Sequence, residues 1–230
     1  MPVTLIILAV TCVVSFVAFS NPRLMERLIL WPPAISRQHQ YDRLLTSGFI
    51  HADFTHLLFN MFTFYSFGAY MERLFQPRIG AIGYALFYLG GIVISALPSY
   101  LRHQDDANYR SLGASGAVSA VLFAFILINP WAMILIFVIP VPAILFAVIY
   151  LGYTIYMDRR RADRINHSAH LWGAIYGVVF TIAVEPRVLG QFIERLMHRE
   201  DFLGPSFRIG NVCRKRLYAL IRFSLMRWPC

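Results

Sequence analysis

Charged residues are scarce in this chain. Only 14% of its 230 residues are Asp, Glu, Lys or Arg, whereas 58% are hydrophobic, and the mean hydropathy is +0.57. Soluble domains typically contain about 25% charged residues. The composition therefore argues against a soluble globular protein and favours one whose solvent is the lipid bilayer.

Cysteine is also rare. The three cysteines, Cys12, Cys213 and Cys230, form neither a closely spaced pair nor a metal-binding pattern. The sequence contains no His-Glu-x-x-His segment, which argues against a zinc metalloprotease. We therefore expect no cofactor and no resident metal ion.

Long uncharged runs predict six membrane-spanning helices. A helix needs about 20 apolar residues to cross the hydrocarbon core. The runs are continuously apolar rather than alternating, which is typical of helices and not of a barrel. The Asn129-Pro130 pair divides the longest run into two spans joined by a tight turn. The expected spans are residues 1–22, 54–71, 79–101, 111–129, 130–157 and 168–184. We therefore expect an all-α membrane bundle of six helices.

The expected organisation is a six-helix membrane domain, residues 1–184, followed by a basic tail, residues 185–230. The first span is interpreted as a retained helix, with a cleaved signal peptide as the alternative. The connection 20–53 mixes arginines with apolar residues, so we expect it to lie along the membrane interface. Apolar residues recur near helical spacing in the tail, which predicts amphipathic helices at the bilayer surface or, alternatively, core packing.

Positive charge is concentrated in the tail. The net charge is +9, and residues 185–230 contain nine Lys or Arg against four acidic residues. Such a tail indicates a cytoplasmic end beside anionic lipid. We expect a prokaryotic cytoplasmic membrane with both termini cytoplasmic, although the arginine-rich loop 158–164 would then lie outside, against the positive-inside rule. The tail has no recognisable nucleic-acid-binding module, so we expect no nucleic-acid partner.

A few polar residues interrupt the spans, and these are the candidates for chemistry because polar groups in lipid cost free energy. His56 and Asn60 are four residues apart, so they lie on one helical face and can direct donors to a common point. Either residue alone is more typical of an interhelical hydrogen bond. Together they form a candidate oxyanion-binding pair.

Ser115 lies in a glycine-rich segment at the start of the fourth span. Gly113 and Gly116 allow close backbone approach and expose the hydroxyl and amide of Ser115 where the helix begins. A helix amino terminus also favours developing negative charge. A serine in a membrane helix is usually a packing residue, so these surroundings make Ser115 the candidate nucleophile.

His170 lies at the start of the sixth span and shares a helical face with Gly173 and Gly177. Small residues let this helix pack closely on a neighbour, and if that neighbour is the fourth span, His170 can reach Ser115. A neutral imidazole there can accept a proton, and since no Asp or Glu lies in the spans, the pair would be a dyad. A packing histidine is the structural alternative.

Metal binding is another interpretation of the histidines. Their spacings of five and three residues suit zinc only if tertiary contacts bring the two pairs together. The pairs are His51 with His56 and His167 with His170.

Three separated segments, in this order, resemble the rhomboid family of intramembrane serine proteases. They are residues 46–61, 113–116 and 169–177. The resemblance covers about residues 3–184. It implies a six-helix rhomboid-like bundle with an interfacial first loop and a water-filled cavity. It also implies cleavage of the transmembrane segments of single-span proteins.

The resemblance further implies a role for each candidate residue. Ser115 would attack the peptide bond, and His170 would take its proton and give it to the leaving amine. His56, Asn60 and the Ser115 amide would hold the oxyanion. Structural roles, which include holding the interfacial loop, are implied for Arg43, Glu72 and His51.

Two positions depart from the family pattern. The first loop contains Tyr41-Asp42-Arg43, so it keeps the arginine but not the tryptophan that family members often have before it. Four residues after the nucleophile, where some members have an aromatic ring that stacks on the histidine, this chain has Ser119. Tyr153 or Tyr156 is the expected replacement.

Two other functions are alternatives to a protease. An inactive rhomboid-like protein that captures membrane clients would usually lack the serine or the histidine, and this chain keeps both. A transporter or channel would show broken helices in repeated halves; Pro140 and Pro142 could break the fifth span, but no matching element occurs elsewhere. We therefore expect an active serine endopeptidase whose partners are transmembrane substrates and membrane lipids.

Overall fold

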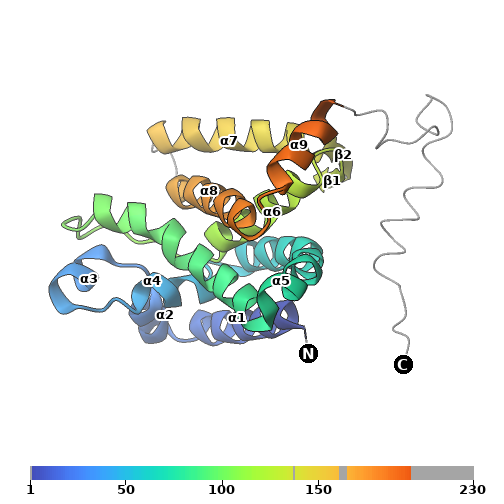
Figure 1. The fold of residues 1–230 in the computed structure, drawn as a ribbon. Coiled ribbons are helices and arrows are strands. Elements are labelled where there is room, and N and C mark those ends of the chain that lie inside the picture. Colours follow the sequence, from blue (N-terminus) through green and yellow to red (C-terminus); the bar gives the residue numbers. More distant parts are fainter. Residues whose placement is uncertain (1, 137, 161–164, 198–230) are drawn as a thin grey trace.

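A computed structural model of the chain describes residues 2–136, 138–160 and 165–197. Positions 161–164 of the arginine-rich loop and tail residues 198–230, with Cys213 and Cys230, lie outside the described residues. The described part is mostly helical (Figure 1). Its longer helices are α1 (Val3–Phe19), α5 (Phe54–Arg102), α6 (Ser115–Ile128), α7 (Ala143–Arg160) and α8 (His167–Val184). The shorter elements are α2 (Pro22–Leu28), α3 (Pro32–Gln38), α4 (Arg43–Thr46), the 3-10 turn η1 (Ser47–Phe49), α9 (Val188–Met197) and two strands, β1 (Met133–Ile136) and β2 (Ile139–Pro142).

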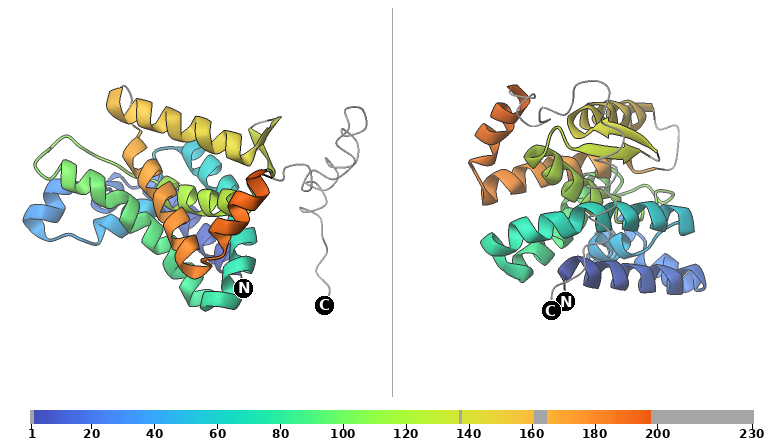
Figure 2. Two further views of the ribbon diagram at one scale, coloured as in Figure 1. Left: turned by 45° about the horizontal axis from the view of Figure 1, so that its top comes forward. Right: turned by 90° about the vertical axis from the view of Figure 1, so that its right-hand side faces the viewer.

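Helix α5 contains both the second and the third expected span. Its 49 residues are interrupted at Gly80, whose φ of 69° and ψ of 177° are not helical. Only glycine adopts such a backbone conformation readily, because it has no Cβ. The halves on either side of Gly80 therefore run in different directions, as Figures 1 and 2 show.

Two of the described helices, α5 and α8, are long and apolar enough to cross a membrane. Helices α1 and α6 are also apolar but shorter, with 17 and 14 residues. At 1.5 Å per residue, α6 is about 21 Å long, compared with about 30 Å for a hydrocarbon core. The described residues therefore form a mostly helical protein in which two helices, rather than six, meet the length and composition needed for a span.

The expectation of an all-helical chain is wrong between α6 and α7. Helix α6 ends at Ile128, before the Asn129-Pro130 break, but the chain then forms an antiparallel hairpin in which Met133 pairs with Pro142 and Ile136 with Ile139. Proline inside a helix removes a hydrogen bond and clashes with the preceding turn. Pro140 and Pro142 therefore exclude a helix here, and the fifth helix begins only at Ala143.

Helix α6 lies at the centre of the molecule. Eleven of its 14 residues are buried, and it packs against α5 and α8. Two views show α1, α5, the α6–α8 pair and α7 stacked in that order (Figures 1 and 2). Helix α7 lies at the outer end of this stack opposite α1, and its buried residues in the described part are Ala143, Ala147 and Thr154. Any side chain that α6 and α8 direct toward each other is therefore held inside the helical stack.

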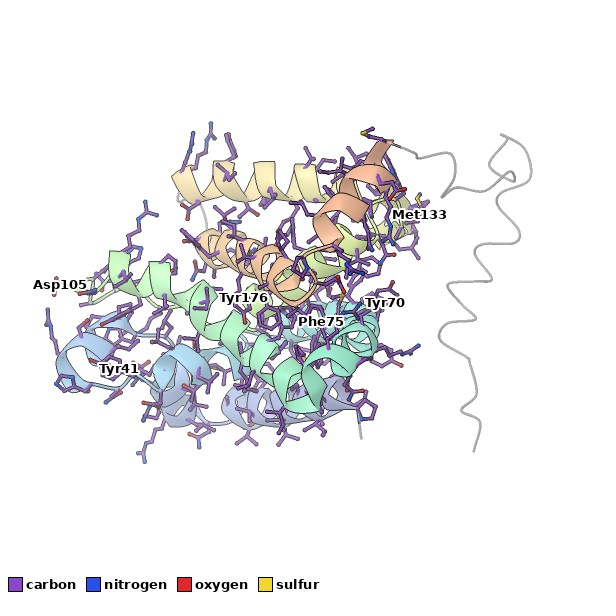
Figure 3. All side chains as sticks on the ribbon, viewed as in Figure 1. Tyr41, Tyr70, Phe75, Asp105, Met133 and Tyr176 are labelled. Atoms are coloured by element: carbon purple, nitrogen blue, oxygen red, sulfur yellow. The ribbon has the colours of Figure 1, made fainter. Side chains whose placement is uncertain are left out.

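The two ends of the molecule differ in structure. Tyr41 and Asp105 mark the end formed by α2–α4 and the loop after α5, while Met133 marks the hairpin at the opposite end (Figure 3). At the first end, Leu30 pairs with Ser111 as an isolated β-bridge. The Arg110 guanidinium also lies 4.3 Å from the centre of the Trp31 ring. The first loop is thereby attached to the segment that leads into α6.

Candidate active site

Ser115 and His170 come together at the amino-terminal ends of α6 and α8. Ser115 is the first residue of α6, and its Oγ lies 2.8 Å from Nε2 of His170. Both side chains are half-buried. A hydroxyl at this distance can donate its proton to an imidazole nitrogen, the geometry required of a nucleophile and its general base.

Glycines allow α6 and α8 to approach closely enough for this contact. A Cβ added at Gly173 would collide with the carbonyl oxygen of Gly116, and one added at Gly177 would collide with that of Ala120. A Cβ added at Gly116 of α6 would collide with the Ser95 hydroxyl of α5. Gly173 and Gly177 therefore set the distance between the helices that carry Ser115 and His170, and Gly116 lets α5 pack closely against α6.

His51 holds the turn that leads into Ser115. The Ala114 amide donates a hydrogen bond to His51 Nε2 at 3.3 Å. His51 Nδ1 lies 3.0 Å from Ser15 Oγ, and this hydroxyl donates to the Phe49 carbonyl at 2.9 Å. Ser15 therefore accepts from Nδ1–H, so His51 is the neutral tautomer that accepts at Nε2. Burial, with a smaller contribution from His56, lowers the pKa of His51 to about 3, which keeps it neutral.

His56 lies beside the same turn. Gly113 has a φ of 116°, and a Cβ at this position would lie 2.8 Å from His56 Cε1. The His56 ring also packs edge-on against His51, with the ring centres 5.0 Å apart. Gly113 is therefore needed both for its backbone conformation and for the space that His56 occupies.

Asn60 lies one turn after His56 on α5 and is buried. Its Nδ2 donates to the His56 carbonyl at 2.9 Å, so this hydrogen bond in the described part of the chain is to its own helix and not to Ser115. An amide nitrogen carries two N–H groups. Asn60 therefore keeps a second donor that this helix bond does not use.

The aromatic contact to His170 comes from a residue that the sequence analysis missed. The Tyr150 ring of α7 stacks on His170 with the ring centres 6.0 Å apart and the planes 16° apart, and its hydroxyl lies 2.8 Å from Ser119 Oγ. Tyr153 instead packs edge-on against His167, and Tyr156 lies under Arg160. The two expected replacements therefore lie against other side chains. The one signal in the sequence for these contacts is a shared spacing: Tyr150 and Tyr153 are three residues apart, as are His167 and His170.

Arg43 and Glu72 make structural contacts at different ends of the molecule. The buried Arg43 guanidinium donates to the carbonyls of Glu26 and Ile29 at 2.7 and 2.8 Å and to Gln40 at 2.6 Å, all within the first loop. Glu72 does not lie against that loop. Its carboxylate accepts the first two amides of α1, those of Val3 and Thr4, at 2.6 and 2.9 Å, so it compensates the positive helix terminus.

The histidines do not form a metal site within residues 2–136, 138–160 and 165–197. His51 lies beside His56, and His167 beside His170 with ring centres 5.9 Å apart. No group of three or more His, Cys, Asp or Glu in these ranges is placed to hold a metal ion.

The chain matches known proteins over most of this region. Residues 38–187 match the family model described as "Rhomboid domain". The chain is 35% identical over 150 residues to "RHOMBOID-like protein 12, mitochondrial" of Arabidopsis thaliana, and the match covers 59% of this chain and 44% of that protein. It is 32% identical over 160 residues to "Rhomboid protein 1, mitochondrial" of Saccharomyces cerevisiae, covering 66% and 44% of the two proteins. It is also 31% identical over 123 residues to "Putative rhomboid protease YdcA" of Bacillus subtilis, covering 51% and 57%.

These comparisons contradict one prediction and identify the family. The prokaryotic cytoplasmic membrane that the basic tail suggested is wrong, because the relatives from Arabidopsis and yeast, and others from zebrafish and mouse, are named as mitochondrial and point to an organellar membrane. The matches span about half the length of these relatives. The family model covers well over half of this chain, so the chain belongs to the rhomboid family.

Proposed function

We propose that this protein is an intramembrane serine endopeptidase that cleaves the transmembrane segments of single-span membrane proteins through a Ser115–His170 dyad. The observation that carries the proposal is the 2.8 Å distance between Ser115 Oγ and His170 Nε2. The "putative rhomboid protease" among the relatives supports the same class of activity. Both reacting groups are present in this chain and in contact.

The dyad supplies a complete route for peptide hydrolysis. His170 Nε2 takes the Ser115 proton as Oγ attacks the substrate carbonyl carbon, which forms a tetrahedral oxyanion. When the C–N bond breaks, the imidazolium gives that proton to the leaving amine and an acyl-serine remains. A water molecule then repeats the cycle: His170 takes its proton, the hydroxide attacks the ester, and the proton returns to Ser115.

The oxyanion would be stabilised by three groups around Ser115. The Ser115 amide belongs to the first turn of α6, where the helix dipole favours negative charge. His56 adjoins the turn at Gly113, and Asn60 retains a second N–H. We assign the oxyanion-binding role to these donors, with Gly113, Gly116, Gly173 and Gly177 as the structural positions that let them converge.

The proposal includes a six-helix membrane domain. Its spans would be α1, the two halves of α5 on either side of Gly80, then α6, α7 and α8. The domain would cover residues 1–184, with 185–230 as an amphipathic basic tail in contact with lipid. Within the described part of that tail, α9 is attached to the turn that follows α6, because Trp131 Nε1 donates to the Arg195 carbonyl at 2.8 Å.

Cleavage of a labelled transmembrane substrate by the purified chain in liposomes tests the proposal. Ser115→Ala and His170→Ala should each abolish cleavage. Ser66→Ala is the matched control, since the Ser66 hydroxyl is exposed on α5 and bonds only within its own helix among the described residues, at 2.8 Å to the Phe62 carbonyl. Cleavage at the natural rate by Ser115→Ala would contradict the proposal, and an inactive natural chain would favour a client-binding protein.

A further inference from the structure

The His170 ring is held between two other rings. Tyr150 of α7 stacks almost parallel to it, with the ring planes 16° apart, and His167 packs edge-on against it with the planes 73° apart. Aromatic pairs with centres 4.5–7 Å apart are attractive and prefer offset-stacked or edge-on arrangements. Two rings at roughly right angles restrict how far the imidazole can turn about its side-chain bonds.

The Tyr150 ring is itself fixed. Its hydroxyl lies 2.8 Å from Ser119 Oγ on α6, and its face lies against Phe146, with ring centres 5.5 Å apart and planes 26° apart. Phe123 of α6 contacts it as well, at 5.7 Å between centres. The tyrosine is therefore oriented from α6 and from its own helix, and it presents one face to His170.

Ser119 links this arrangement back to the reacting serine. Ser115 and Ser119 are four residues apart on α6 and so lie on the same helical face. The contacts form a closed circuit: Ser115 to His170, His170 to Tyr150, Tyr150 to Ser119, and Ser119 back to Ser115 through one turn of α6. Three helices contribute to this circuit, and α7 contributes only the tyrosine.

We propose that Tyr150 is the positioning residue of His170 and that Ser119 anchors Tyr150. This inference rests on the proposed function of the dyad. A small hydroxyl at position 119 leaves room for a ring from another helix and supplies the acceptor or donor that holds it. The ring on the histidine is thereby provided by α7, at the outer end of the stack, instead of by the helix that carries the nucleophile.

Four variants of the full chain in liposomes test the inference: Tyr150→Leu, Tyr150→Phe, Ser119→Ala and the double variant Tyr150→Phe/Ser119→Ala. The measurements are kcat and KM for a transmembrane substrate, the rate at which a fluorophosphonate labels Ser115, and the thermal unfolding temperature. We expect Tyr150→Leu to lower both kcat and the labelling rate by about tenfold, with KM changed less than about twofold, because misorientation affects the proton transfer and not substrate binding.

The conservative variants distinguish the contribution of the Tyr150–Ser119 hydrogen bond to kcat from the contribution of the Tyr150 ring. Tyr150→Phe keeps the ring and loses the hydroxyl, so we expect a decrease in kcat of about threefold, and Ser119→Ala should give a similar decrease. The double variant should be no slower than either single variant, because both remove the same hydrogen bond. Tyr156→Leu is the control: it removes a half-exposed tyrosine of the same helix that does not contact His170 among the described residues.

The outcomes distinguish this inference from the proposed function. If the natural chain cuts no faster than Ser115→Ala, the dyad and the positioning role fail together. If the natural chain is active and Tyr150→Leu matches Tyr156→Leu in kcat and labelling rate, the dyad stands and the positioning role is refuted. A Tyr150→Leu variant that unfolds at lower temperature but keeps its kcat would also refute it, since Tyr150 would then only stabilise the fold.

Discussion

Gly173→Ala tests whether the approach of α8 to α6 sets the geometry of the dyad. A Cβ at this position would lie 2.8 Å from the carbonyl carbon of Gly116 and 3.0 Å from its Cα. Carbon atoms in contact are normally about 3.5–4.0 Å apart. The two helices must therefore separate by nearly an ångström, a shift of the size that costs about 100-fold in rate when it misplaces reacting groups.

The stability change should be smaller than the loss of activity. Overpacking costs about 1–3 kcal/mol, while replacing a helical glycine with alanine contributes about 0.5–1 kcal/mol in the opposite direction. We therefore expect Gly173→Ala to lower the free energy of unfolding by about 0–2.5 kcal/mol while it removes nearly all cleavage. Substrate cleavage and thermal unfolding of the same preparation measure the two effects.

Gly152→Ala is the matched control. Gly152 also lies in a helix, α7, but a Cβ there would meet no atom within 4 Å. This variant should cleave at the natural rate and be at least as stable. Natural activity in Gly173→Ala, or equal loss in both variants, would refute the reasoning that the α6–α8 distance controls the dyad.

The remaining predictions concern the supports of the site. His51 is neutral in the folded protein, with a pKa of about 3, against about 6.5 when unfolded; because the unfolded chain binds the proton more readily, stability is lost as the pH falls below about 6.5. Lowering the pH to 5 should lower the free energy of unfolding by about 2 kcal/mol. Thermal unfolding measured across this pH range should show a smaller loss of stability in His51→Asn than in the natural chain. Glu72→Gln should lower stability by about 1–3 kcal/mol, because a neutral amide is a weaker acceptor for the first amides of α1; unchanged unfolding would contradict this. Arg43→Lys should lower the free energy of unfolding by a similar ~1–3 kcal/mol, because the single nitrogen of an ammonium cannot replace both Nη1, which donates to two carbonyls, and Nε, which donates to Gln40. Protease accessibility of the first loop should rise with it.

The contact between Ser115 and His170 could be predicted because its cause is local in the sequence. Gly173 and Gly177 repeat at helical spacing, and such small residues indicate a close helix–helix contact wherever they occur. The glycines around Ser115 indicated that the neighbouring helix is the one that begins there, α6. The contact needs no information beyond these patterns and the family resemblance.

The contact of Tyr150 with His170 could not be predicted, because it depends on the position of α7 along the axis of α8. Tyr153 and Tyr156 occupy the same helix and have the same chemistry, and sequence spacing does not select among the three. The register of α7 is set by the hairpin that precedes it, which was expected to be helical. Helix α7 begins at Ala143, after the hairpin, and in this position Tyr150 lies beside His170.

The same hairpin has a consequence for the outer edge of β2. The Ala143 amide donates to the Ala132 carbonyl at 2.8 Å, so alternate amides of the strand, those of Val141 and Ile139, also face β1. The amides that would face outward belong to Pro140 and Pro142, which have no N–H. This edge therefore offers carbonyl groups but no donors to another chain, which prevents strand addition and aggregation at an apolar tip whose Val138 is 85% exposed.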